Sequence, residues 1–228
     1  MKNINKYIIM CGGKYSWLET PKQLTEINGE PLVARTIRLL KENGITDIAI
    51  SSKDSRFDNF GVPRIEHNNE FEEIKENGKE YIKGYWVDAF YPTDEPVCYL
   101  YGDVYYSENC IKTIVETQTM DILFFASTIP CRPDYFKMWE EPFAFKVANQ
   151  ERFKQGIEIC KQKRDKGETN REPISWELYR VLNGIDINTH KITTGFIAVN
   201  DVSTDIDCIK DKEELEKILN KGEIEDAI

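Results

Sequence analysis

Short apolar runs separated by polar, glycine-rich segments predict the strands of a buried sheet. Tyr7 to Met10 is such a run, and it ends at the pair Gly12-Gly13, which predicts a strand followed by a loop. Pro31 can open a helix at little cost because its missing N–H would have no helical partner, and Gly44 can end it. Ile48 to Ile50 then predicts a second strand. This order favours a parallel sheet wound with helices.

Two further runs, Val97 to Tyr101 and Asp121 to Ala126, have the pattern of buried strands. The chain between Ser51 and Pro96 is polar and helix-prone. We expect its charge run, Glu70 to Glu80, to be the solvated face of a helix rather than a site.

The second half predicts a polar helix over Gln150 to Lys163 and a strand within Ile192 to Val199. Asp211 is expected to be the N-cap of the last helix, since Glu214 three residues later makes a variant of the capping box. Gly222 is the expected end of that helix. The pattern shows no linker, so we predict one domain over residues 1–228.

The composition of the chain excludes several classes of function. The 228 residues are 40% hydrophobic, enough for a sizeable core, and the formal net charge is −10. Proteins that bind nucleic acid need clustered Lys and Arg to displace counterions, so DNA and RNA are poor candidates. No apolar run has transmembrane length, and we expect a cytoplasmic protein without a membrane partner. Six cysteines form no CxxC pair, which predicts reduced, mostly buried thiols rather than a zinc site.

The loop after the first strand is the first candidate for chemistry. Gly12 and Gly13 let backbone N–H groups approach phosphate oxygens closely, and Lys14 and Lys22 can add positive charge beside a triphosphate. Neither a Walker motif nor a GxGxxG pattern is present. The glycine pair alone would predict only a turn, so the surrounding residues decide.

The whole segment from Met10 to Leu32 resembles the signature of sugar nucleotidyltransferases and their cytidylyltransferase relatives, including the MobA-like and methylerythritol-phosphate cytidylyltransferase-like proteins. That signature runs A-G-G-x-G-T-R-L, then P-K, then I-x-G-x-P-L. The residues that fit it here are Gly12, Gly13, Ser16, Leu18, Pro21, Lys22, Ile27, Gly29, Pro31 and Leu32. The resemblance implies a three-layer α/β/α sandwich with a mostly parallel, Rossmann-like mixed sheet.

Two residues depart from the signature. Tyr15 stands where the family often has Gly, and Trp17 stands where it usually has an Arg that binds phosphate. Tryptophan cannot replace that cation. Three alternatives stay open: Lys14 supplies the charge, another residue reaches in, or activity has been lost.

A second motif is Gly102-Asp103 at the end of the strand pattern Val97 to Tyr101. Open α/β sheets bind ligands at the carboxyl ends of their strands. The motif resembles the family's G-D, whose Asp holds Mg²⁺. Glycosyltransferases of similar fold usually show D-x-D, whereas Tyr105 takes the third position here. The alternative for Asp103 is a cap on the following helix.

The third motif is Asp201 to Cys208, which resembles the family's closing D-I-D-T-P-E-D-L element. By resemblance, one of Asp205 and Asp207 completes the metal site with Asp103. The two alternate along the chain, so both can face one side of an extended segment.

The resemblance also implies weaker assignments. Gly84 and the stretch to Phe90 resemble the segment where relatives recognise the base and ribose. The residues implied for nucleotide binding are Cys11, Gly12, Gly13, Lys14, Lys22, Ser51, Gly84 and Gly102. Residues 1–127 would form the nucleotide half, and residues 128–228 the acceptor half with the closing metal element. Residues 128–190 match no motif of the family. From residue type alone, four cations of the second half are candidate phosphate or carboxylate binders, although surface or core packing is the expected role of any one of them: Arg132, Lys146, Arg180 and Lys191.

The implied function is transfer of an NMP group from an NTP to a small phosphorylated acceptor, with release of pyrophosphate. Lys22, Lys14 and Asp103 would be catalytic, and Mg²⁺ the cofactor. Pro21-Lys22-Gln23 resembles the cytidylyltransferases that act on methylerythritol phosphate, which favours CTP, while UTP, GTP and dTTP stay open. A homodimer is also open. The alternatives are a glycosyltransferase that uses a nucleotide sugar and a non-catalytic nucleotide-binding protein.

Overall fold

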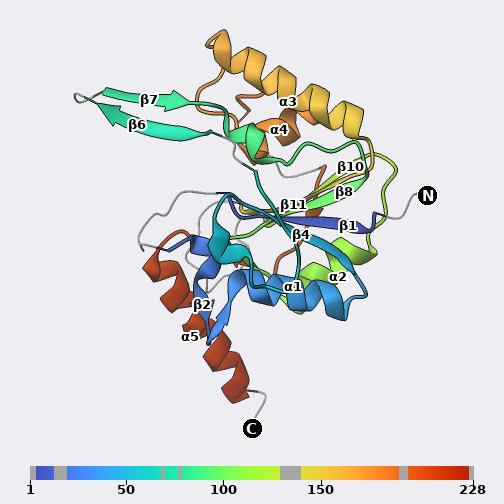
Figure 1. Cartoon of the computed structure of the whole chain (residues 1–228), viewed down its shortest axis with the longest axis vertical. Helices are drawn as coiled ribbons and strands as arrows, with labels where there is room; N and C mark the ends of the chain where they lie inside the picture. The colour runs from blue at the N-terminus through green and yellow to red at the C-terminus, as the bar shows by residue number, and fades with distance from the viewer. Residues whose placement is uncertain are drawn as a thin grey trace.

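A seven-stranded sheet forms the middle layer of the protein (Figure 1). The computed structural model describes residues 4–12, 20–67, 70–76, 79–128, 140–189 and 195–225. The strand order is β12-β10-β11-β8-β1-β4-β5, and only β11 of these seven runs antiparallel to its neighbours. The strands are β1 (Lys6–Met10), β4 (Asp47–Ser51), β5 (Arg64–Ile65), β8 (Val97–Tyr101), β10 (Ile122–Ala126), β11 (Pro142–Val147) and β12 (Ile197–Ala198).

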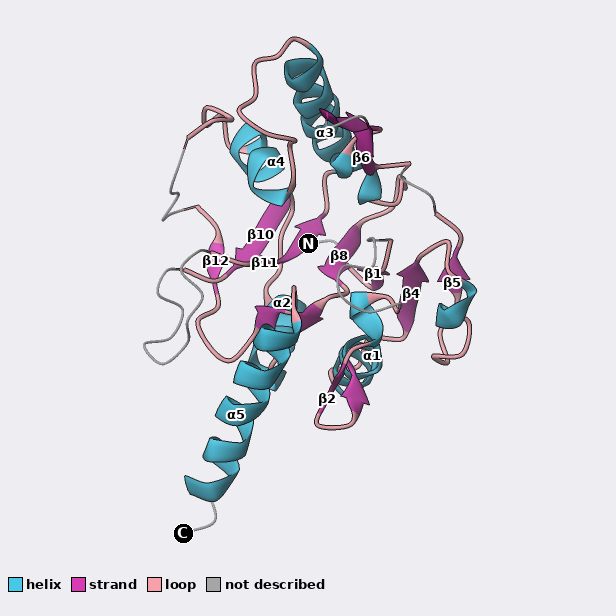
Figure 2. Cartoon of the chain, turned by 90° about the vertical axis from the view of Figure 1, so that its left-hand side faces the viewer, coloured by secondary structure: helices cyan, strands magenta, loops and turns pink. Residues whose placement is uncertain are grey.

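Helices cover both faces of this sheet. Helices α3 (Gln150–Asp165) and α4 (Ser175–Leu182) pack together on one face, and α1 (Leu32–Glu42) packs with α2 (Glu108–Glu116) on the other (Figure 2). Helix α5 (Ile209–Glu225) lies on the side of α1 and α2. The predicted three-layer α/β/α sandwich with a mostly parallel mixed sheet is confirmed.

The first β-loop-α-β unit follows the pattern of the sequence. Strands β1 and β8 are almost wholly buried and pair in parallel, as the unbroken apolar runs predict. Pro31 directly precedes α1. At the other end Gly44 adopts a φ of +81°, and the N–H of Ile45 bonds back to the carbonyl of Leu40. This left-handed glycine ends the helix as predicted.

The charge run Glu70 to Glu80 is not a helix, and that prediction is wrong. The chain forms a hairpin of β6 (Glu72–Glu76) and β7 (Lys79–Lys83), which stands away from the body of the molecule in Figure 1. The sequence between the two strands is Asn77-Gly78, the dipeptide most favoured in two-residue hairpin loops. The prediction rested on the charge pattern and did not use this turn dipeptide.

The last helix also differs from the prediction at both ends. It begins at Ile209, two residues before Asp211, and continues past Gly222 to Glu225. The Asp211 carboxylate accepts hydrogen bonds from the N–H groups of Asp207 and Cys208, at 2.8 and 3.0 Å. Asp211 is therefore the third helical residue and bonds back to the start, which is the reciprocal half of a capping box.

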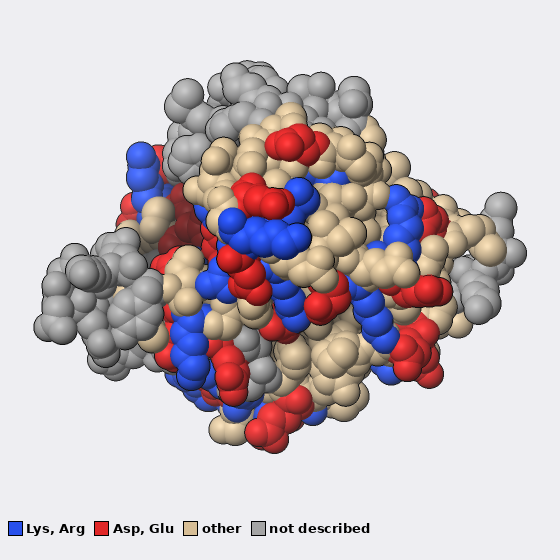
Figure 3. All heavy atoms as spheres, turned by 90° about the horizontal axis from the view of Figure 1, so that it is seen from above, with Lys and Arg blue, Asp and Glu red and all other residues tan. Residues whose placement is uncertain are grey.

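Surface charge is mixed over the face that α3 covers. Figure 3 shows Lys and Arg interspersed with Asp and Glu there. Among the helices of the described segments, none has the length and hydropathy needed to cross a bilayer.

Candidate functional site

Three neighbouring parallel strands end together at one edge of the sheet. Met10, the last residue of β1, lies opposite Ser51 of β4 and Tyr101 of β8. The loops that leave these strands are tied to each other: the Cys11 N–H donates to the carbonyl of Ser51, and the Gly102 N–H donates to that of Met10. The first and second sequence motifs therefore meet where open α/β sheets bind ligands.

Gly102 is required by this close approach. A Cβ on Gly102 would lie 2.6 Å from the Met10 carbonyl oxygen and 2.7 Å from Cys11 Sγ. Burial raises the pKa of the Cys11 thiol well above its usual value, and the charge of Asp103 adds to the effect. Cys11 is thus a neutral packing residue, as the prediction of buried thiols implies. Gly12, in contrast, has open space where its Cβ would be.

Lys22 joins the first motif to the third. It lies on the short 3-10 helix η1 (Lys22–Leu24), and its Nζ donates to Asp207 Oδ1 at 2.7 Å. Burial lowers the pKa of Lys22, but Asp103, Asp207 and Asp205 outweigh it and leave the pKa above its usual value. The ammonium is therefore held in its charged form among three carboxylates.

A small antiparallel pair brings the second and third motifs together. Strand β9 (Val104–Tyr105) pairs with β13 (Thr204–Asp205), which places Asp205 opposite Val104, the residue after Asp103. The carbonyl of Asp103 also accepts a hydrogen bond from Ile206. Asp103 does not cap α2, because Ser107 is the N-cap and its Oγ accepts from Cys110 N. The alternative role for Asp103 is therefore wrong.

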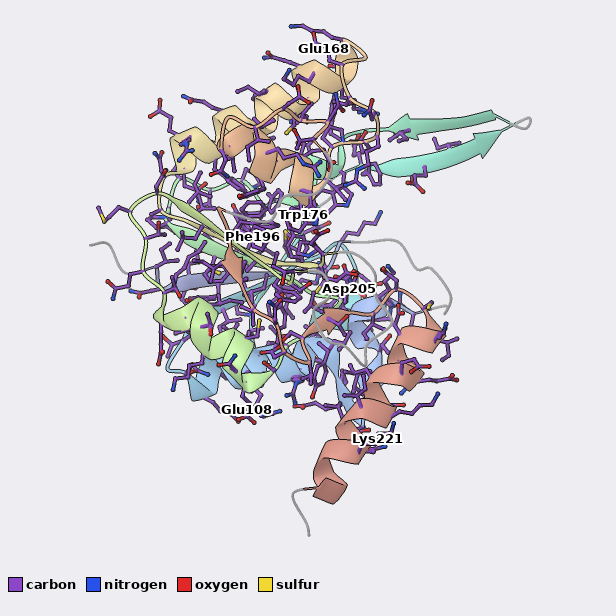
Figure 4. The ribbon with its side chains drawn as sticks, turned by 180° about the vertical axis from the view of Figure 1, so that it is seen from behind. Glu108, Glu168, Trp176, Phe196, Asp205 and Lys221 are labelled. Atoms are coloured by element: carbon purple, nitrogen blue, oxygen red, sulfur yellow. The ribbon has the colours of Figure 1, made fainter. Side chains whose placement is uncertain are left out.

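These residues open onto a cleft of about 700 Å³, called the central cleft below. Trp176 of α4 and Asp205 of β13 both line it, and Figure 4 labels Trp176 on the side of α3 and α4 and Asp205 on the side of α5. The described residues that line it are Lys22, Trp86, Tyr101, Asp103, Val104, Glu140, Glu141, Pro142, Asn170, Arg171, Ile174, Ser175, Trp176, Glu177, Arg180, Ile187, Asn188, Thr189, Asp205 and Asp207.

Helix α4 supplies a charged wall of the central cleft. Glu177 is 3% exposed, and its carboxylate accepts from Arg171 Nε at 2.9 Å and from Arg180 Nη1 at 2.6 Å. It also accepts from the N–H of Ile174. Burying this carboxylate is tolerated because it is paired on both sides. Arg180 was a candidate binder from sequence, and the structure places it in the central cleft.

Lys146 has the packing role that was expected for any one of the four cations, not the role of a phosphate binder. It is 3% exposed, and its Nζ donates to the carbonyls of Ile114 and Val115 at 2.7 and 2.9 Å. These are carbonyls of the last turn of α2, where a cation is favoured. Burial lowers the pKa of Lys146. Lys146 of β11 therefore caps the carbonyl end of α2, and it does not line the central cleft.

Gly84 is not among the residues that line the central cleft. It borders a second cavity of about 750 Å³, between the hairpin base, the 3-10 helix η3 (Trp86–Ala89) and α3. Its φ is +70°, and a Cβ there would lie 2.7 Å from the carbonyl oxygen of Glu70. A close backbone approach accounts for this glycine. Ser51 is buried at the end of β4 and does not line the central cleft.

Some predicted residues lie outside the described part of the chain. These are Gly13, Lys14, Tyr15, Ser16, Trp17 and Leu18 of the first loop, together with Arg132 and Lys191.

Three aspartates of the central cleft are the described carboxylates that lie together near Lys22. Within the described ranges, no three or more His, Cys, Asp or Glu side chains are grouped closely enough to hold a metal by themselves. One cleft is nevertheless lined by Asp103, Asp205 and Asp207, and the charge of each carboxylate raises the pKa of Lys22. Mg²⁺ usually takes one or two protein carboxylates and completes its shell with water and substrate phosphates.

Several residues of the central cleft were not predicted. Glu141, Arg171 and Glu177 lie in segments that match no motif, and Trp86 lies in the stretch from Gly84 to Phe90, where only Gly84 was singled out. Glu177 carried one usable signal, since it stands three residues after Ile174 at the start of an apolar stretch and caps α4.

The sequence comparison finds one family. Residues 7–74 match the MobA-like NTP transferase domain. This segment contains the first motif, so the predicted resemblance is confirmed there. The chain matches no curated protein sequence.

Solved structures resemble the whole chain. The CTP:phosphocholine cytidylyltransferase of Streptococcus pneumoniae is 15% identical, with a TM-score of 0.52 over 96% of this chain and all of the other. A putative glucose-1-phosphate thymidylyltransferase of Bacillus anthracis is 15% identical, with a TM-score of 0.55 over 93% of this chain and 94% of the other. The inositol-1-phosphate CTP transferase of T. maritima is 17% identical, with a TM-score of 0.56 over 95% of this chain and 97% of the other. The chain thus matches the MobA-like NTP transferase domain over residues 7–74, and its fold is similar to the folds of these three solved structures.

Proposed function

We propose that this protein transfers an NMP group from an NTP to a small phosphorylated acceptor and releases pyrophosphate. One observation carries the proposal: Lys22 pairs with Asp207 across 185 residues of sequence, beside Asp103 and Asp205. Three motifs that resemble one family thus meet in one cleft. The domain match over residues 7–74 and the fold support the same activity.

Lys22 has the position for stabilising negative charge on the α-phosphate. Its ammonium is charged at neutral pH, and it is only 20% exposed, so its field is screened less than that of a surface lysine. The backbone of Gly12 and of Gly13 would hold the phosphates. Lys14 would add a second cation in the loop.

Asp103, with Asp205 or Asp207, would hold Mg²⁺ through carboxylate oxygens. When bound, Mg²⁺ supplies neutralisation of phosphate charge and fixes the phosphates in place. Asp207 would then serve two partners, since it also holds Lys22 at 2.7 Å. The antiparallel pairing of β9 and β13 keeps Asp103 and Asp205 together without any ligand.

The chemical step needs no strong general base. An acceptor phosphate is anionic near neutral pH, so its oxygen can attack the α-phosphorus as the bond to pyrophosphate breaks. The protein contributes alignment of the two phosphates and neutralisation of charge by Lys22. No cysteine or histidine is required in this scheme.

We propose residues 1–127 as the half that binds the nucleotide and residues 128–228 as the half that binds the acceptor and closes the metal site. CTP is the favoured donor, because Pro21-Lys22-Gln23 resembles cytidylyltransferases. Two of the similar solved structures are also named for CTP. Sugar, polyol and amino-alcohol phosphates are the acceptors to screen, and this chemistry belongs to a biosynthetic path for activated small molecules such as nucleotide sugars.

Thermal stabilisation by nucleotides tests the proposal. A ligand that binds only the folded state raises the melting temperature by mass action. CTP, UTP, GTP, ATP and dTTP are each compared with and without Mg²⁺, in wild-type protein and in Asp103→Asn. We expect a shift that is largest for one NTP, depends on Mg²⁺ and is lost in the variant.

Two other results would contradict the proposal. A shift with nucleotide sugars and none with NTPs would favour a glycosyltransferase. A shift with an NTP but no product with any acceptor would favour a non-catalytic nucleotide-binding protein, the alternative that Trp17 raises.

A further inference from the structure

One guanidinium of α1 holds strand β9, the strand that directly follows Asp103. Arg35, near the start of α1, donates from Nε to the carbonyl of Tyr106 at 2.8 Å. Its Cζ lies 4.3 Å from the centre of the Tyr105 ring. Arg35 thus contacts the last residue of β9 and the residue directly after it.

These contacts are shielded from water. The side chain of Arg35 is 16% exposed, and Tyr105 is 6% exposed. Glu30 Oε2 also lies 3.5 Å from Arg35 Nη1 and offsets part of its charge. A cation over a ring and a charge-assisted hydrogen bond are both stronger where water is excluded. The guanidinium therefore fixes the backbone of β9 against α1.

Tyr105 lies on the side of β9 that faces away from the central cleft. Val104 lines the cleft, whereas Tyr105 is not among the described residues that line it. Neighbouring residues of a strand point to opposite faces, which agrees with this division. Tyr105 belongs instead to a small buried cluster that joins the first and third motifs, together with Ile27, Leu32, Ile206 and Leu215.

The carboxylates of the central cleft are attached to this same cluster. Asp103 directly precedes β9, and its carbonyl accepts from the N–H of Ile206 at 2.9 Å. Asp205 lies in β13, which pairs with β9. Ile206, which packs in the cluster with Tyr105, stands between Asp205 and Asp207 in the chain. A shift of β9 would therefore move Asp103 relative to the aspartates of the third motif.

We propose that Arg35 is a positioning residue, which holds Asp103 in place relative to Asp205 and Asp207 for the Mg²⁺ that binds with the NTP. The inference rests on the proposed function. Arg35 is not among the described residues that line the central cleft, so it acts through the Tyr105 ring and the backbone of β9. Groups behind the ligands of a metal orient those ligands, and replacing such a group commonly weakens metal binding about tenfold or more.

The Mg²⁺ dependence of nucleotide binding tests this inference. The rise in melting temperature caused by a fixed, saturating concentration of the best NTP is measured against free Mg²⁺, and the midpoints are compared. We expect Arg35→Ala to raise the midpoint about tenfold. Arg38→Ala is the matched control, because Arg38 lies on the same helix and bonds to Glu30 and Glu42 rather than to β9. Its midpoint should match wild type.

Two readouts separate positioning from a loss of fold. Arg35→Lys keeps a cation that can reach the Tyr105 ring, so its midpoint should lie between those of wild type and Arg35→Ala. In turnover assays, excess Mg²⁺ should restore kcat of Arg35→Ala to within about twofold of wild type, because the aspartates are displaced and not removed. A purely structural role would lower kcat at every Mg²⁺ concentration and leave the midpoint unchanged.

A second pair of variants tests the ring. Tyr105→Leu removes the surface that the guanidinium contacts and should raise the midpoint. Tyr105→Phe keeps the ring and should raise the midpoint less. This pair decides the inference if Arg35→Ala does not fold.

A wild-type midpoint in Arg35→Ala, or equal midpoints in the two Tyr105 variants, would overturn the inference alone. Wild-type protein that none of the five NTPs stabilises at any Mg²⁺ concentration would overturn the proposed function, and this inference with it.

Discussion

Lys22 Nζ lies 2.7 Å from Asp207 Oδ1, which joins the η1 helix near the start of the chain to the loop before its last helix. The pair is partly shielded, with 20% of the Lys22 side chain and 51% of the Asp207 side chain exposed. Its value for stability is small, as for most accessible ion pairs. The pair matters because it brings a cation of the first motif and a carboxylate of the third motif together in the central cleft.

Replacing Lys22 by Met should lower kcat by about a hundredfold or more, the usual effect of removing one charge-stabilising donor. Stability should change little. The measurement is steady-state transfer together with thermal unfolding. Lys6→Met is the control, because Lys6 also makes a 2.9 Å ion pair, with Glu95, but lies at the other end of β1. A Lys22→Met enzyme as active as Lys6→Met would contradict the assigned role.

Asparagine variants of the three cleft aspartates should identify the metal ligands. Asp103→Asn should abolish turnover and leave the fold intact, since the carboxylate is proposed to hold Mg²⁺. Of Asp205→Asn and Asp207→Asn, the one that removes the second ligand should raise the Mg²⁺ concentration needed for half-maximal activity by about tenfold or more. The measurement is a Mg²⁺ titration of activity.

Asp201→Asn is the control for this series. Asp201 belongs to the same motif, but its carboxylate accepts from Ser107 Oγ and does not line the central cleft. Its Mg²⁺ dependence should match wild type. An Asp103→Asn enzyme with wild-type turnover would refute the metal assignment.

Gly102 and Gly12 should respond differently to alanine. A Cβ on Gly102 would collide with the Met10 carbonyl and Cys11 Sγ, so Gly102→Ala should lower the free energy of unfolding by about 1–3 kcal/mol. Gly12→Ala meets nothing within 4 Å and should leave stability unchanged, while raising KM for the NTP if phosphates approach its backbone. Urea unfolding and steady-state kinetics measure both effects. Equal stability of the two variants would contradict the geometry of the strand ends.

Glu30 should make stability depend on pH in acid. Its carboxylate accepts from Arg38 Nε and Nη2, each at 2.8 Å, and this hydrogen bonding holds the pKa of Glu30 below 4.5. A lowered folded-state pKa means that the stabilisation is present above the unfolded value and is lost as pH falls through the folded one.

The Glu30→Gln variant measures this term. It should lose about 0.5 kcal/mol at pH 7, a value reduced for partial solvent exposure, and the difference from wild type should shrink near pH 3. Urea unfolding at the two pH values gives the comparison. Glu116→Gln, in an exposed pair with Lys112, is the control. A difference that does not change with pH would contradict the lowered pKa.

Sequence patterns predicted the first β-loop-α-β unit well because local signals agree with the fold there. Unbroken apolar runs became buried strands, and Pro31 and Gly44 bounded a helix as expected. The hairpin at Glu72–Lys83 was missed because its sequence is dense in charged residues and lacks the alternation that marks a half-buried strand. In that segment the turn dipeptide was more informative than the charge pattern.

The contacts that hold the backbone around Trp86, a residue that lines the central cleft, could not be predicted for a different reason. Arg164 and Glu172 hydrogen-bond to the backbone of Gly84 and Trp86, which lie about 80 residues earlier in the chain. Lys146 resembles any phosphate-binding lysine in sequence, and only its burial against the carbonyls of α2 shows its structural role. Long-range packing decides such roles, and a single sequence does not encode them locally.

The most direct test of the central claim is to measure both products of the reaction. Wild-type protein is incubated with Mg²⁺, each NTP and each class of phosphorylated acceptor, and pyrophosphate and the nucleotide-linked product are quantified by mass spectrometry. We predict that the two appear in equal amounts with one preferred NTP, require the acceptor, and disappear in Lys22→Met. Consumption of a nucleotide sugar without pyrophosphate, and no product from any NTP, would contradict the account.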